Sequence, residues 1–597
     1  MINGYNNKVL DVDLDSGHIA EYGLADEVIS RYLGGRGLGV YFLTKETSPA
    51  VDPLSGENLL VIATGGLTGS MAPTSGRFSV TFKSPLTGTI TSSNSGGFWG
   101  VSFKRCGYDA LIIRGKSAVP VYLNVSDGKA ELVECPELWG ESIPSVTEKL
   151  KGRHAKTAKV LAIGPAGEKG VLFAALINDG TRAVGRGGAG AVMGFKNLKA
   201  VVADGRRQFL PAQEKLYQSG ISQSNKLLLS MPVTAHALYE LGTAGLVKLI
   251  NDHDMLPHRN FQDVRHRPED VENISGEALR EQILIAPKPC FNCRIACGRR
   301  TRVGGKEGEG PEYETVALMG SNLGIYDIRE VALASYACNE LGIDTISFGN
   351  TVGLAMELFE KGIIGASDTG GMELRFGTRN VLENLVGMTA NRQGFGDLLA
   401  LGARRLAEKF AHPRLAMVSK GLEFPGYEPR ATTAQALGYA TSPRGGCHLQ
   451  GGYAVTLGFF GGSREVDRFL IETTAGHVVT QQDSGCIVDS LGLCRFSSYA
   501  FGENELSRTF AGLTGVDLSP HDFEMIARFI QDREREFNNA VGFTPSDDTL
   551  PDRFFTEKIE IAGEPRCLDR ERHFAPLLNK YYEIRKWDKN GVPLDHG

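Results

Sequence analysis

Three cysteines in one short segment, Cys290, Cys293 and Cys297, constrain this chain more than any other feature. Thiols with the spacing Cys-x-x-Cys-x-x-x-Cys, in a long chain whose other cysteines are scattered, usually bind metal. The segment offers three thiolates on one turn of loop and helix, so a fourth ligand has to come from elsewhere. Tetrahedral sulfur ligands suit either zinc or an iron–sulfur cluster. Because no Cys or His follows at zinc-finger spacing, we favour a cluster over a structural zinc ion.

Composition limits the class of protein. The 597 residues are enough for roughly three or four domains. The 64 Lys and Arg residues and 70 Asp and Glu residues give a net charge of −6, which argues against nucleic acid as a partner. The N-terminus is polar and no apolar run reaches the roughly 18 residues of a membrane span, so we expect no membrane contact. Ten scattered cysteines fit a reducing compartment, and a cytoplasmic location is predicted.

Glycine-rich loops are concentrated in the first third of the chain. Runs of β-forming residues alternate there with turn residues, which predicts a β-rich domain over residues 1–210. The loops at 32–39, 74–80 and 178–194 also contain arginine. Glycine lets backbone amides approach a ligand, and arginine can bind phosphate through paired hydrogen bonds. Each loop alone would indicate a tight turn. None of the loops matches a nucleotide-binding motif, so ordinary nucleotide binding is not supported. Three glycine-rich loops that contain arginine together predict one shared phosphate-bearing cofactor.

Helical periodicity dominates beyond residue 210. Apolar residues recur three and four positions apart in two sets, which are Ala334, Ala337, Cys338 and Leu341, and Leu399, Ala403, Leu406 and Phe410. A break at 422–430 marks a third domain. We therefore expect an α+β multidomain fold, in which a β-rich N-terminal domain precedes two mostly helical domains, 211–418 and 419–597, with the cofactor between them.

One six-residue pattern occurs twice. Residues 339–344, NELGID, and 489–494, DSLGLC, share the form Asn/Asp-x-Leu-Gly-aliphatic-Asp/Cys. Two unrelated helix ends would explain the pattern, because glycine commonly caps a helix C-terminus. Two half-sites that bind two similar ligands would also explain it, and we favour this interpretation. The second copy ends in Cys494, which is a candidate for the missing fourth thiolate.

Motifs along the whole chain resemble one family. The segments YLGGRGLG, GRGGAGAVMG, CFNCRIACG, GEGPEYET, CNELGIDTIS, KGLEFPGYEPR, SPRGGCHL and DSLGLC follow one another in the order found in the tungsten-dependent aldehyde ferredoxin oxidoreductases. The resemblance implies one tungsten held by the dithiolene sulfurs of two pyranopterins, with a 4Fe-4S cluster nearby and no obligatory tungsten ligand from the protein. It also implies that Cys290, Cys293, Cys297 and Cys494 ligate the cluster.

The resemblance also assigns residues to the two pterins. Around the first pterin and its phosphate it places Arg77, Asn94, Ser95, Gly96, Arg182, Ala183 and Gly185. For the second motif and its twin it implies Asn339, Gly342, Ile343, Asp344 and Thr345, together with Asp489, Gly492 and Leu493. Main-chain oxygens of Asn94 and Ala183 would bind a magnesium ion between the pterin phosphates, since magnesium prefers oxygen ligands. Arg77 would bridge pterin and cluster.

Two positions depart from the family pattern. The first motif opens with Asn339 where the family has Asp, so one acceptor there lacks its charge. The Glu-x-x-His iron motif of the family's subunit interface is also absent, because Glu330 is followed by Val331, Ala332 and Leu333. A metal-bridged homodimer is therefore not expected, and both homo- and hetero-oligomers stay open.

Glu314 and His448 match the family's acid–base pair beside the metal. Oxidation of an aldehyde adds oxygen from water and removes protons and two electrons, which a carboxylate base and an imidazole can assist. Taken alone, His448 would be a structural histidine, and Glu312 is as polar a neighbour as Glu314. The leading hypothesis is oxidation of an aldehyde substrate to the acid, in one or both directions, with ferredoxin or an iron–sulfur subunit as acceptor. Reduction of an aromatic acyl-CoA thioester and a non-catalytic zinc-stapled scaffold are the alternatives.

Overall fold

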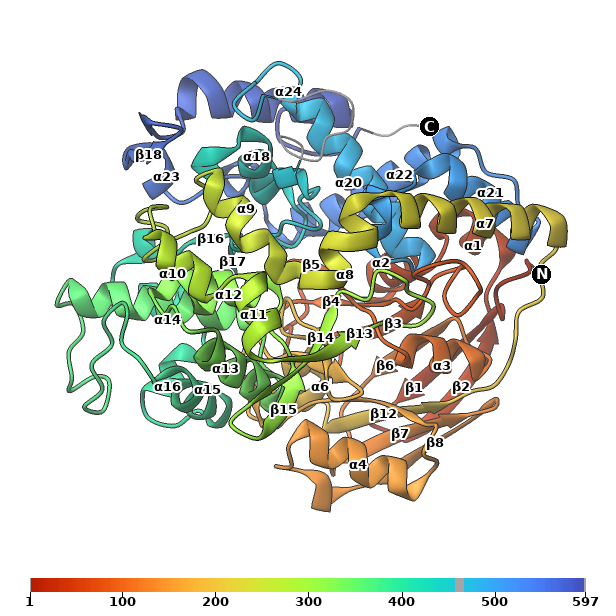
Figure 1. Ribbon diagram of the computed structural model, residues 1–597. Coiled ribbons are helices and arrows are strands. Elements are labelled where there is room, and N and C mark those ends of the chain that lie inside the picture. Colours follow the sequence, from red (N-terminus) through yellow and green to blue (C-terminus); the bar gives the residue numbers. More distant parts are fainter. Residues whose placement is uncertain (1, 457–466, 595–597) are drawn as a thin grey trace.

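The computed structural model describes residues 2–456 and 467–594 (Figure 1). Two six-stranded sheets are formed by residues up to Asp204, and most of the helices follow them in sequence. In Figure 1 the strands lie at the lower right and the helical part covers the left and the top. The predicted α+β class, with a β-rich N-terminal part, is confirmed. None of the helices in the described ranges is long and apolar enough to span a membrane.

The first sheet has the strand order β2-β1-β6-β3-β4-β5. Its strands are β1 (Lys8–Asp13), β2 (His18–Gly23), β3 (Leu60–Thr64), β4 (Phe78–Lys83), β5 (Ile90–Ser95) and β6 (Ala110–Arg114). Only β1 and β6 pair in parallel, and the other neighbours are antiparallel. Strand β3 is buried along its whole length because its sequence, LVIAT, is apolar on both faces.

The second sheet has the order β11-β10-β9-β12-β7-β8. Its strands are β7 (Val121–Ser126), β8 (Lys129–Glu134), β9 (Lys159–Ala162), β10 (Leu176–Asn178), β11 (Arg182–Val184) and β12 (Leu198–Asp204). One hydrophobic cluster joins apolar residues of both sheets around Trp99 and Phe103, whose rings stack 5.2 Å apart. Because Trp99 also donates a hydrogen bond to the Val201 carbonyl at 2.9 Å, the two sheets are fixed to each other.

Short helices connect these strands, and they are α1 (Asp26–Tyr32), α2 (Gly35–Glu46), α3 (Trp99–Arg105), α4 (Ile143–Arg153), α5 (Pro165–Glu168) and α6 (Ala189–Phe195). The middle of the chain forms α7 (Glu214–Ser230), α8 (Leu238–Leu241), α9 (Leu246–Asp252), α10 (Pro268–Asn273), α11 (Gly276–Gln282), α12 (Tyr313–Met319), α13 (Ile328–Leu341), α14 (Thr345–Glu360), α15 (Leu382–Asn391), α16 (Phe395–Leu399) and α17 (Ala403–Lys409). A small sheet of β13 (Leu284–Lys288), β14 (Gly298–Val303) and β15 (Lys306–Glu309) interrupts them.

The last part of the chain is also mostly helical. It contains α18 (Thr433–Thr441), α20 (Thr474–Leu491), α21 (Glu503–Thr514), α22 (Pro520–Val541), α23 (Arg553–Thr556) and α24 (Ala575–Arg585). Two short hairpins accompany these helices, β16 (Val418–Ser419) with β17 (Leu422–Glu423), and β18 (Ile559–Ile561) with β19 (Glu564–Arg566).

Helix α7 crosses α21 at very close range. A Cβ on Gly512 would lie 2.5 Å from the Tyr217 backbone nitrogen, and one on Gly220 would lie 2.6 Å from Thr509 Oγ1. Glycine is needed at such a crossing because any side chain would push the helices apart. Residues from the predicted second and third domains therefore pack directly together, and the boundaries at 210 and 418 stay predictions.

One of the two helical patterns forms a single helix and the other does not. Ala334 to Leu341 lie on α13, as predicted. The set from Leu399 to Phe410 is divided between α16 and α17, because Gly402 adopts a φ of 81°, which a helix interior does not allow. The prediction of one continuous helix there is wrong.

Candidate active site

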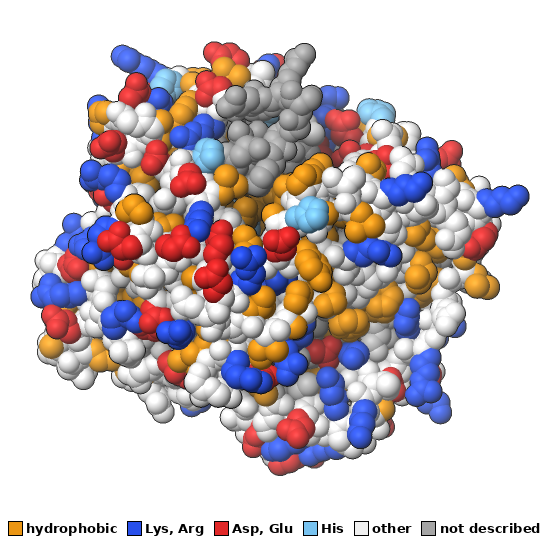
Figure 2. All heavy atoms as spheres, in the orientation of Figure 1, with side chains coloured by type: hydrophobic (Ala, Val, Ile, Leu, Met, Phe, Trp, Pro, Cys, Tyr) orange, Lys and Arg blue, Asp and Glu red, His pale blue; other side chains and the backbone are white. Residues whose placement is uncertain are grey.

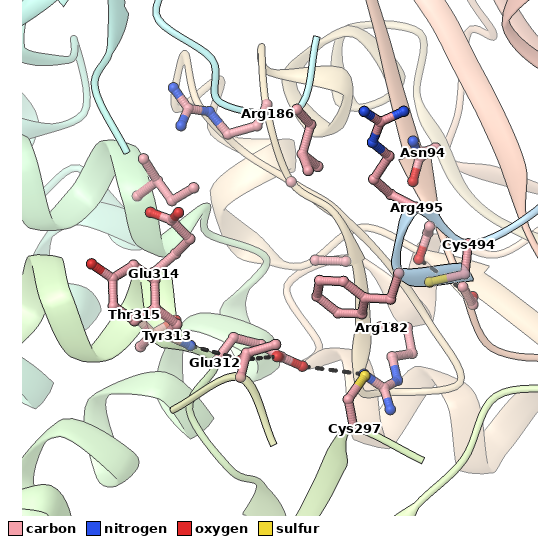
Figure 3. Close-up of a pocket in the computed structure, with 18 of the residues that line it drawn as sticks. Asn94, Arg182, Arg186, Cys297, Glu312, Tyr313, Glu314, Thr315, Cys494 and Arg495 are labelled. Carbon is pink, nitrogen blue, oxygen red and sulfur yellow. Dashed lines mark hydrogen bonds and ion pairs between the residues drawn. The ribbon is translucent and has the colours of Figure 1, made fainter. Parts of the chain in front are cut away.

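An interior cavity of about 330 Å³ lies where the N-terminal sheets meet the helical part (Figure 3). Its wall is built from residues around β4, β5 and β11, from the β13–β14 loop, from the start of α12, and from the ends of α13 and α20. Most of the site residues predicted from the sequence line this wall. They are Arg77, Asn94, Ser95, Gly96, Arg182, Ala183, Gly185, Cys290, Cys293, Cys297, Glu314, Asn339, Ile343, Asp344, Thr345, His448, Asp489 and Cys494. The fold thus gathers segments that are hundreds of residues apart.

The three clustered cysteines stand on the loop between β13 and β14. This differs from the predicted turn of loop and helix, because the segment has to reverse the chain between antiparallel strands that pair Lys288 with Gly298. Within the described residues, no group of three or more His, Cys, Asp or Glu side chains is placed to hold a single metal ion. Cys290, Cys293 and Cys297 nevertheless all line the same cavity.

Cys494 joins them from the far end of helix α20. Its Sγ lies 3.5 Å from Nη2 of Arg77, a residue of the glycine-rich segment before β4. Burial opposes the charge of Arg77, but the nearby Cys494 and Cys290 raise the pKa of the guanidinium. Glycine allows the backbone to approach here, since a Cβ on Gly96 would lie 2.9 Å from the Cys290 Sγ. The glycine-rich segments and the cysteines therefore form one wall.

Arg77 also connects the thiols to the end of α20. Its Nη1 donates a hydrogen bond to Asn94 Oδ1, and Asn94 Nδ2 donates to Asp489 Oδ1 at 2.7 Å. Burial raises the pKa of Asp489, although Arg36 and Arg77 oppose this effect. A relay of partly buried polar groups thus links Cys494, Asn94 and Asp489 through Arg77.

Both copies of the repeated pattern end a helix. Gly342 ends α13 and Gly492 ends α20, each in the left-handed conformation with a φ of 80°. Gly342, Gly492 and Leu493 lie outside the cavity wall; Leu493 is in the hydrophobic core with 1% of its surface exposed. After the first copy, Asp344 accepts hydrogen bonds from the backbone nitrogens of Ile346 and Ser347 and caps helix α14. The repeated motif therefore both caps helices and contributes residues to the cavity wall.

The glycine-rich segment at 32–39, which forms the start of helix α2 from Gly35 on, does not reach the cavity. Arg36 is buried and forms two hydrogen bonds with Glu534 on α22, at 2.9 and 2.5 Å. A Cβ on Gly35 would lie 2.2 Å from the Asp489 carbonyl oxygen. This segment thus supports the end of α20 from behind, and Arg36 pairs with Glu534 instead of lining the cavity with the arginines of the other two loops.

Several arginines surround the cavity. Arg182 pairs with Glu309 at 3.1 Å and with Glu312 at 3.3 Å, while Arg444 donates to the Ser92 carbonyl at 2.8 Å. In the described part of the chain, the buried Nε of Arg77, Nε of Arg444 and Nη1 of Arg495 have no hydrogen-bond partner. Buried N–H groups left unpaired cost about 1–3 kcal/mol each, so these atoms suit an anionic ligand in the cavity.

Glu314 lies in the first turn of α12 and points into the cavity (Figure 3). Its Oε2 accepts a hydrogen bond from the Gly426 nitrogen at 2.7 Å, and its Oε1 lies 3.3 Å from His448 Nε2. Burial raises the pKa of Glu314 to about 7. Burial, together with Arg186 and Arg444, lowers the pKa of His448 well below its usual value, so the imidazole is neutral. A carboxylate poised near neutral pH beside a neutral imidazole is suited to proton transfer.

The neighbouring Glu312 is differently placed. Its carboxylate pairs with Arg182 and accepts a hydrogen bond from Thr243 Oγ1 at 2.5 Å, and 41% of its side chain is exposed. Only 14% of the Glu314 side chain is exposed. The sequence alone does not distinguish the two carboxylates, but the structure gives them different partners. Glu314 is the one beside His448.

Some residues of the wall were not identified from the sequence. Arg186, Lys288, Arg444 and Arg495 are the cations among them, and Tyr427 and Cys447 are two further residues. Arg444 Nη2 lies 2.9 Å from Cys447 Sγ; burial raises the pKa of this thiol, but Arg444 and Arg186 outweigh it and leave the pKa lowered. Arg186, Arg444 and Arg495 each stand within five positions of a residue already singled out, and that proximity was the available signal.

Comparisons with known proteins agree along the whole chain. Residues 9–205 match the family described as "Aldehyde ferredoxin oxidoreductase, N-terminal domain", and residues 220–596 match "Aldehyde ferredoxin oxidoreductase, domains 2 & 3". The tungsten-containing aldehyde ferredoxin oxidoreductase of Pyrococcus furiosus is 40% identical, and the alignment covers 98% of this chain and 96% of that protein. Its counterpart in Pyrococcus abyssi is 41% identical over 98% and 97%.

A solved structure has the same fold. It is the active-site complex BamBC of benzoyl coenzyme A reductase in complex with 1,5-dienoyl-CoA, with a TM-score of 0.86 and 25% sequence identity. The superposition covers 99% of this chain and 96% of that one.

Proposed function

Because the chain belongs to the aldehyde ferredoxin oxidoreductase family, we propose that it oxidises aldehydes to carboxylic acids with a tungsten–bispyranopterin and a 4Fe-4S cluster. The observation that carries this proposal is the buried pair of Glu314 and His448, which faces a cavity that four cysteines also line. The relatives that are about 40% identical over nearly the whole chain are named tungsten-containing aldehyde ferredoxin oxidoreductases, which supports an aldehyde as the substrate.

The cavity fits an anionic cofactor with two similar halves. Unpaired N–H groups of Arg77, Arg444 and Arg495 are available to phosphate oxygens, and arginine binds phosphate strongly. The equivalent ends of α13 and α20 would each hold one pterin, through Asn339 to Thr345 on one side and Asp489 on the other. Gly342, Gly492 and Leu493 would shape these ends from behind.

Further assignments complete the first pterin site. Ser95, Gly96 and Gly185 would bring the backbone close to it, and Arg182 would bind its phosphate. We assign the magnesium ion to the main-chain oxygens of Asn94 and Ala183, because magnesium prefers oxygen ligands.

The cluster would be held by Cys290, Cys293, Cys297 and Cys494. Thiolates are the usual ligands of such clusters, and two segments of the chain bring these four to one cavity. Arg77 lies within hydrogen-bonding range of Cys494 and also contacts Asn94, so it connects the cluster wall with the pterin wall.

The reaction converts an aldehyde and water into a carboxylic acid, two protons and two electrons. When bound, the tungsten centre supplies the redox chemistry by accepting the electrons. Glu314, with a pKa of about 7, takes up a proton as water adds to the carbonyl carbon. The neutral His448 orients the carbonyl through a hydrogen bond. Burial of both side chains excludes bulk water from this step.

Reduction of an aromatic acyl-CoA thioester is the second candidate, and the similarity to the fold of benzoyl coenzyme A reductase favours it. The names and higher identity of the aldehyde ferredoxin oxidoreductases favour the aldehyde reaction more strongly. We further propose that ferredoxin or an iron–sulfur subunit receives the electrons, that the protein works in the cytoplasm, and that it assembles as a homo- or hetero-oligomer.

The proposal is tested on anaerobically purified protein. We expect tungsten, iron and pterin in the preparation, and aldehyde-dependent reduction of a viologen dye that is lost in Glu314→Gln. Metal-replete protein that reduces no dye with any aldehyde, but consumes an aromatic acyl-CoA thioester, would support the second candidate instead. Zinc with no tungsten, iron or pterin would support the non-catalytic scaffold.

A further inference from the structure

Exposed and partly exposed aromatic and basic side chains lie on and beside the cysteine loop. We define the basic–aromatic patch by six residues, which are Met71, Phe98, Arg105, Lys159, Phe291 and Arg294. Met71 has 60% of its surface exposed and Phe98 has 40%, although both are large and apolar. Figure 2 shows hydrophobic side chains gathered right of centre on the visible face, with Lys and Arg around them. Exposed apolar patches rimmed by polar groups commonly mark interaction sites.

Contacts within the patch hold it in one arrangement. The rings of Phe98 and Phe291 meet edge to face with centroids 6.4 Å apart. The Arg105 guanidinium lies 5.2 Å from the Phe291 centroid, and the Lys159 ammonium lies 5.5 Å from that of Phe98. These distances allow cation–π attraction, which keeps each charge next to an aromatic ring.

The cysteine loop itself is fixed to the segment that carries Met71. Asn292 Nδ2 donates hydrogen bonds to the carbonyl oxygens of Met71 and Ala72, each at 2.8 Å. The Asn292 carbonyl accepts one from the Thr74 nitrogen, also at 2.8 Å. A partner that binds here would therefore meet a preformed surface.

The positive charges of the patch are not neutralised by the protein. Among the described residues, no carboxylate forms an ion pair with Arg105, Lys159 or Arg294, while most other surface arginines have such partners. The chain as a whole carries a net charge of −6, so a local positive surface stands out. Unpaired charges at a rim attract a partner of opposite charge.

The patch also includes the residues that separate the thiols. Phe291 follows Cys290 directly, and Arg294 follows Cys293 directly. Cys290 and Cys293 are both partly exposed. A redox partner seated on Phe291 and Arg294 would be separated from the proposed cluster by little more than these side chains.

We propose that the basic–aromatic patch is the docking site of an acidic iron–sulfur protein that accepts one electron at a time. This inference rests on the proposed function, because it needs a cluster at the four cysteines. One aldehyde oxidation leaves two electrons on the enzyme, so two oxidised partner molecules dock in turn and each leaves reduced by one electron. The small, charged patch suits such brief encounters, because transient redox complexes have small interfaces and salt-dependent association.

The test compares charge reversal on the patch with charge reversal elsewhere. The variants are Lys159→Glu with Arg294→Glu in one chain, Arg294→Lys as the conservative change, and Lys409→Glu on α17 as the control. A small acidic ferredoxin is the probe, its binding to the holoenzyme is measured by calorimetry, and its reduction with aldehyde is followed at low and at high salt. Iron and tungsten contents and viologen reduction are measured on every variant.

We expect the double variant to bind the ferredoxin about tenfold more weakly or worse, to show a raised KM for ferredoxin, and to lose most of the salt dependence. The viologen reduction and metal content of the double variant should stay within about twofold of the parent. The ferredoxin affinity of Arg294→Lys and of Lys409→Glu should also stay within about twofold of the parent. Equal ferredoxin affinity in the parent and the double variant, or no binding by the parent at low salt, overturns the docking site. If the metal-replete parent fails to reduce viologen with aldehyde, the proposed function itself has failed.

Discussion

Replacement of Glu314 by Gln tests the role of the buried carboxylate most sharply. The change keeps the shape of the side chain and leaves an oxygen for the hydrogen bond from the Gly426 nitrogen, but removes the base. General bases contribute about 10²–10⁴-fold to rate, so we expect aldehyde-dependent viologen reduction to fall by at least about a hundredfold. Tungsten and iron contents should be unchanged.

The pH profile gives a second measurement of the same group. With a pKa of about 7, the ionised share of Glu314 rises from about one tenth at pH 6 to about nine tenths at pH 8. The kcat of the parent should therefore rise by nearly tenfold over this interval, and the residual activity of Glu314→Gln should not. Glu312→Gln is the matched control: its rate can change through Arg182, but its pH midpoint should remain near 7.

Glu314→Gln should raise the free energy of unfolding at high pH, although it lowers the rate. A carboxyl pKa that rises from 4.5 to about 7 on folding costs about 3 kcal/mol once both states are ionised. The cost is absent below pH 4.5, grows as the pH rises to about 7, and is constant above. Glu314→Gln should thus unfold at a higher temperature than the parent at pH 8, with little difference at pH 4.5. A parent-like rate, an unaltered pH profile and no stabilisation at pH 8 would together refute the reasoning.

Three further predictions concern the cavity wall and the residues that support it from behind. Arg36→Met should destabilise the protein by about 3–5 kcal/mol in chemical unfolding, because it leaves the buried Glu534 charge unpaired; a loss below about 1 kcal/mol would contradict the pairing. Gly96→Ala should lower the iron content, because its Cβ would lie 2.9 Å from Cys290 Sγ, whereas full iron occupancy would show that the loop can move aside. Cys494→Ser should abolish the electron paramagnetic resonance signal of the reduced cluster, and an unchanged signal would remove Cys494 from the ligand set.

Local patterns in the sequence predicted much of the architecture. Runs of β-forming residues and glycine turns correctly indicated the β-rich first part, and the spacing of Ala334 to Leu341 indicated a helix. These features depend on neighbours within a few positions. The division at Gly402 was missed because an apolar stripe carries no information about one glycine with a φ of 81°.

Long-range contacts explain the remaining differences. Arg36 looked like a phosphate ligand because it stands among glycines, but its partner Glu534 lies about five hundred positions later and no local pattern shows it. The cysteine loop was expected to run into a helix, and the pairing of β13 with β14 prevents this. The different roles of Glu314 and Glu312 likewise follow from their partners. Glu314 lies beside His448 and Glu312 pairs with Arg182, and both partners are distant in sequence.

Electron counting in anaerobic, metal-replete protein tests the central claim most directly. A known amount of aldehyde is added with excess oxidised viologen, and the carboxylic acid and the reduced dye are both quantified. The account predicts two molecules of reduced dye for every molecule of acid, with tungsten, pterin and iron present in the same protein. Protein with a full complement of these metals that forms no acid from any aldehyde would contradict it.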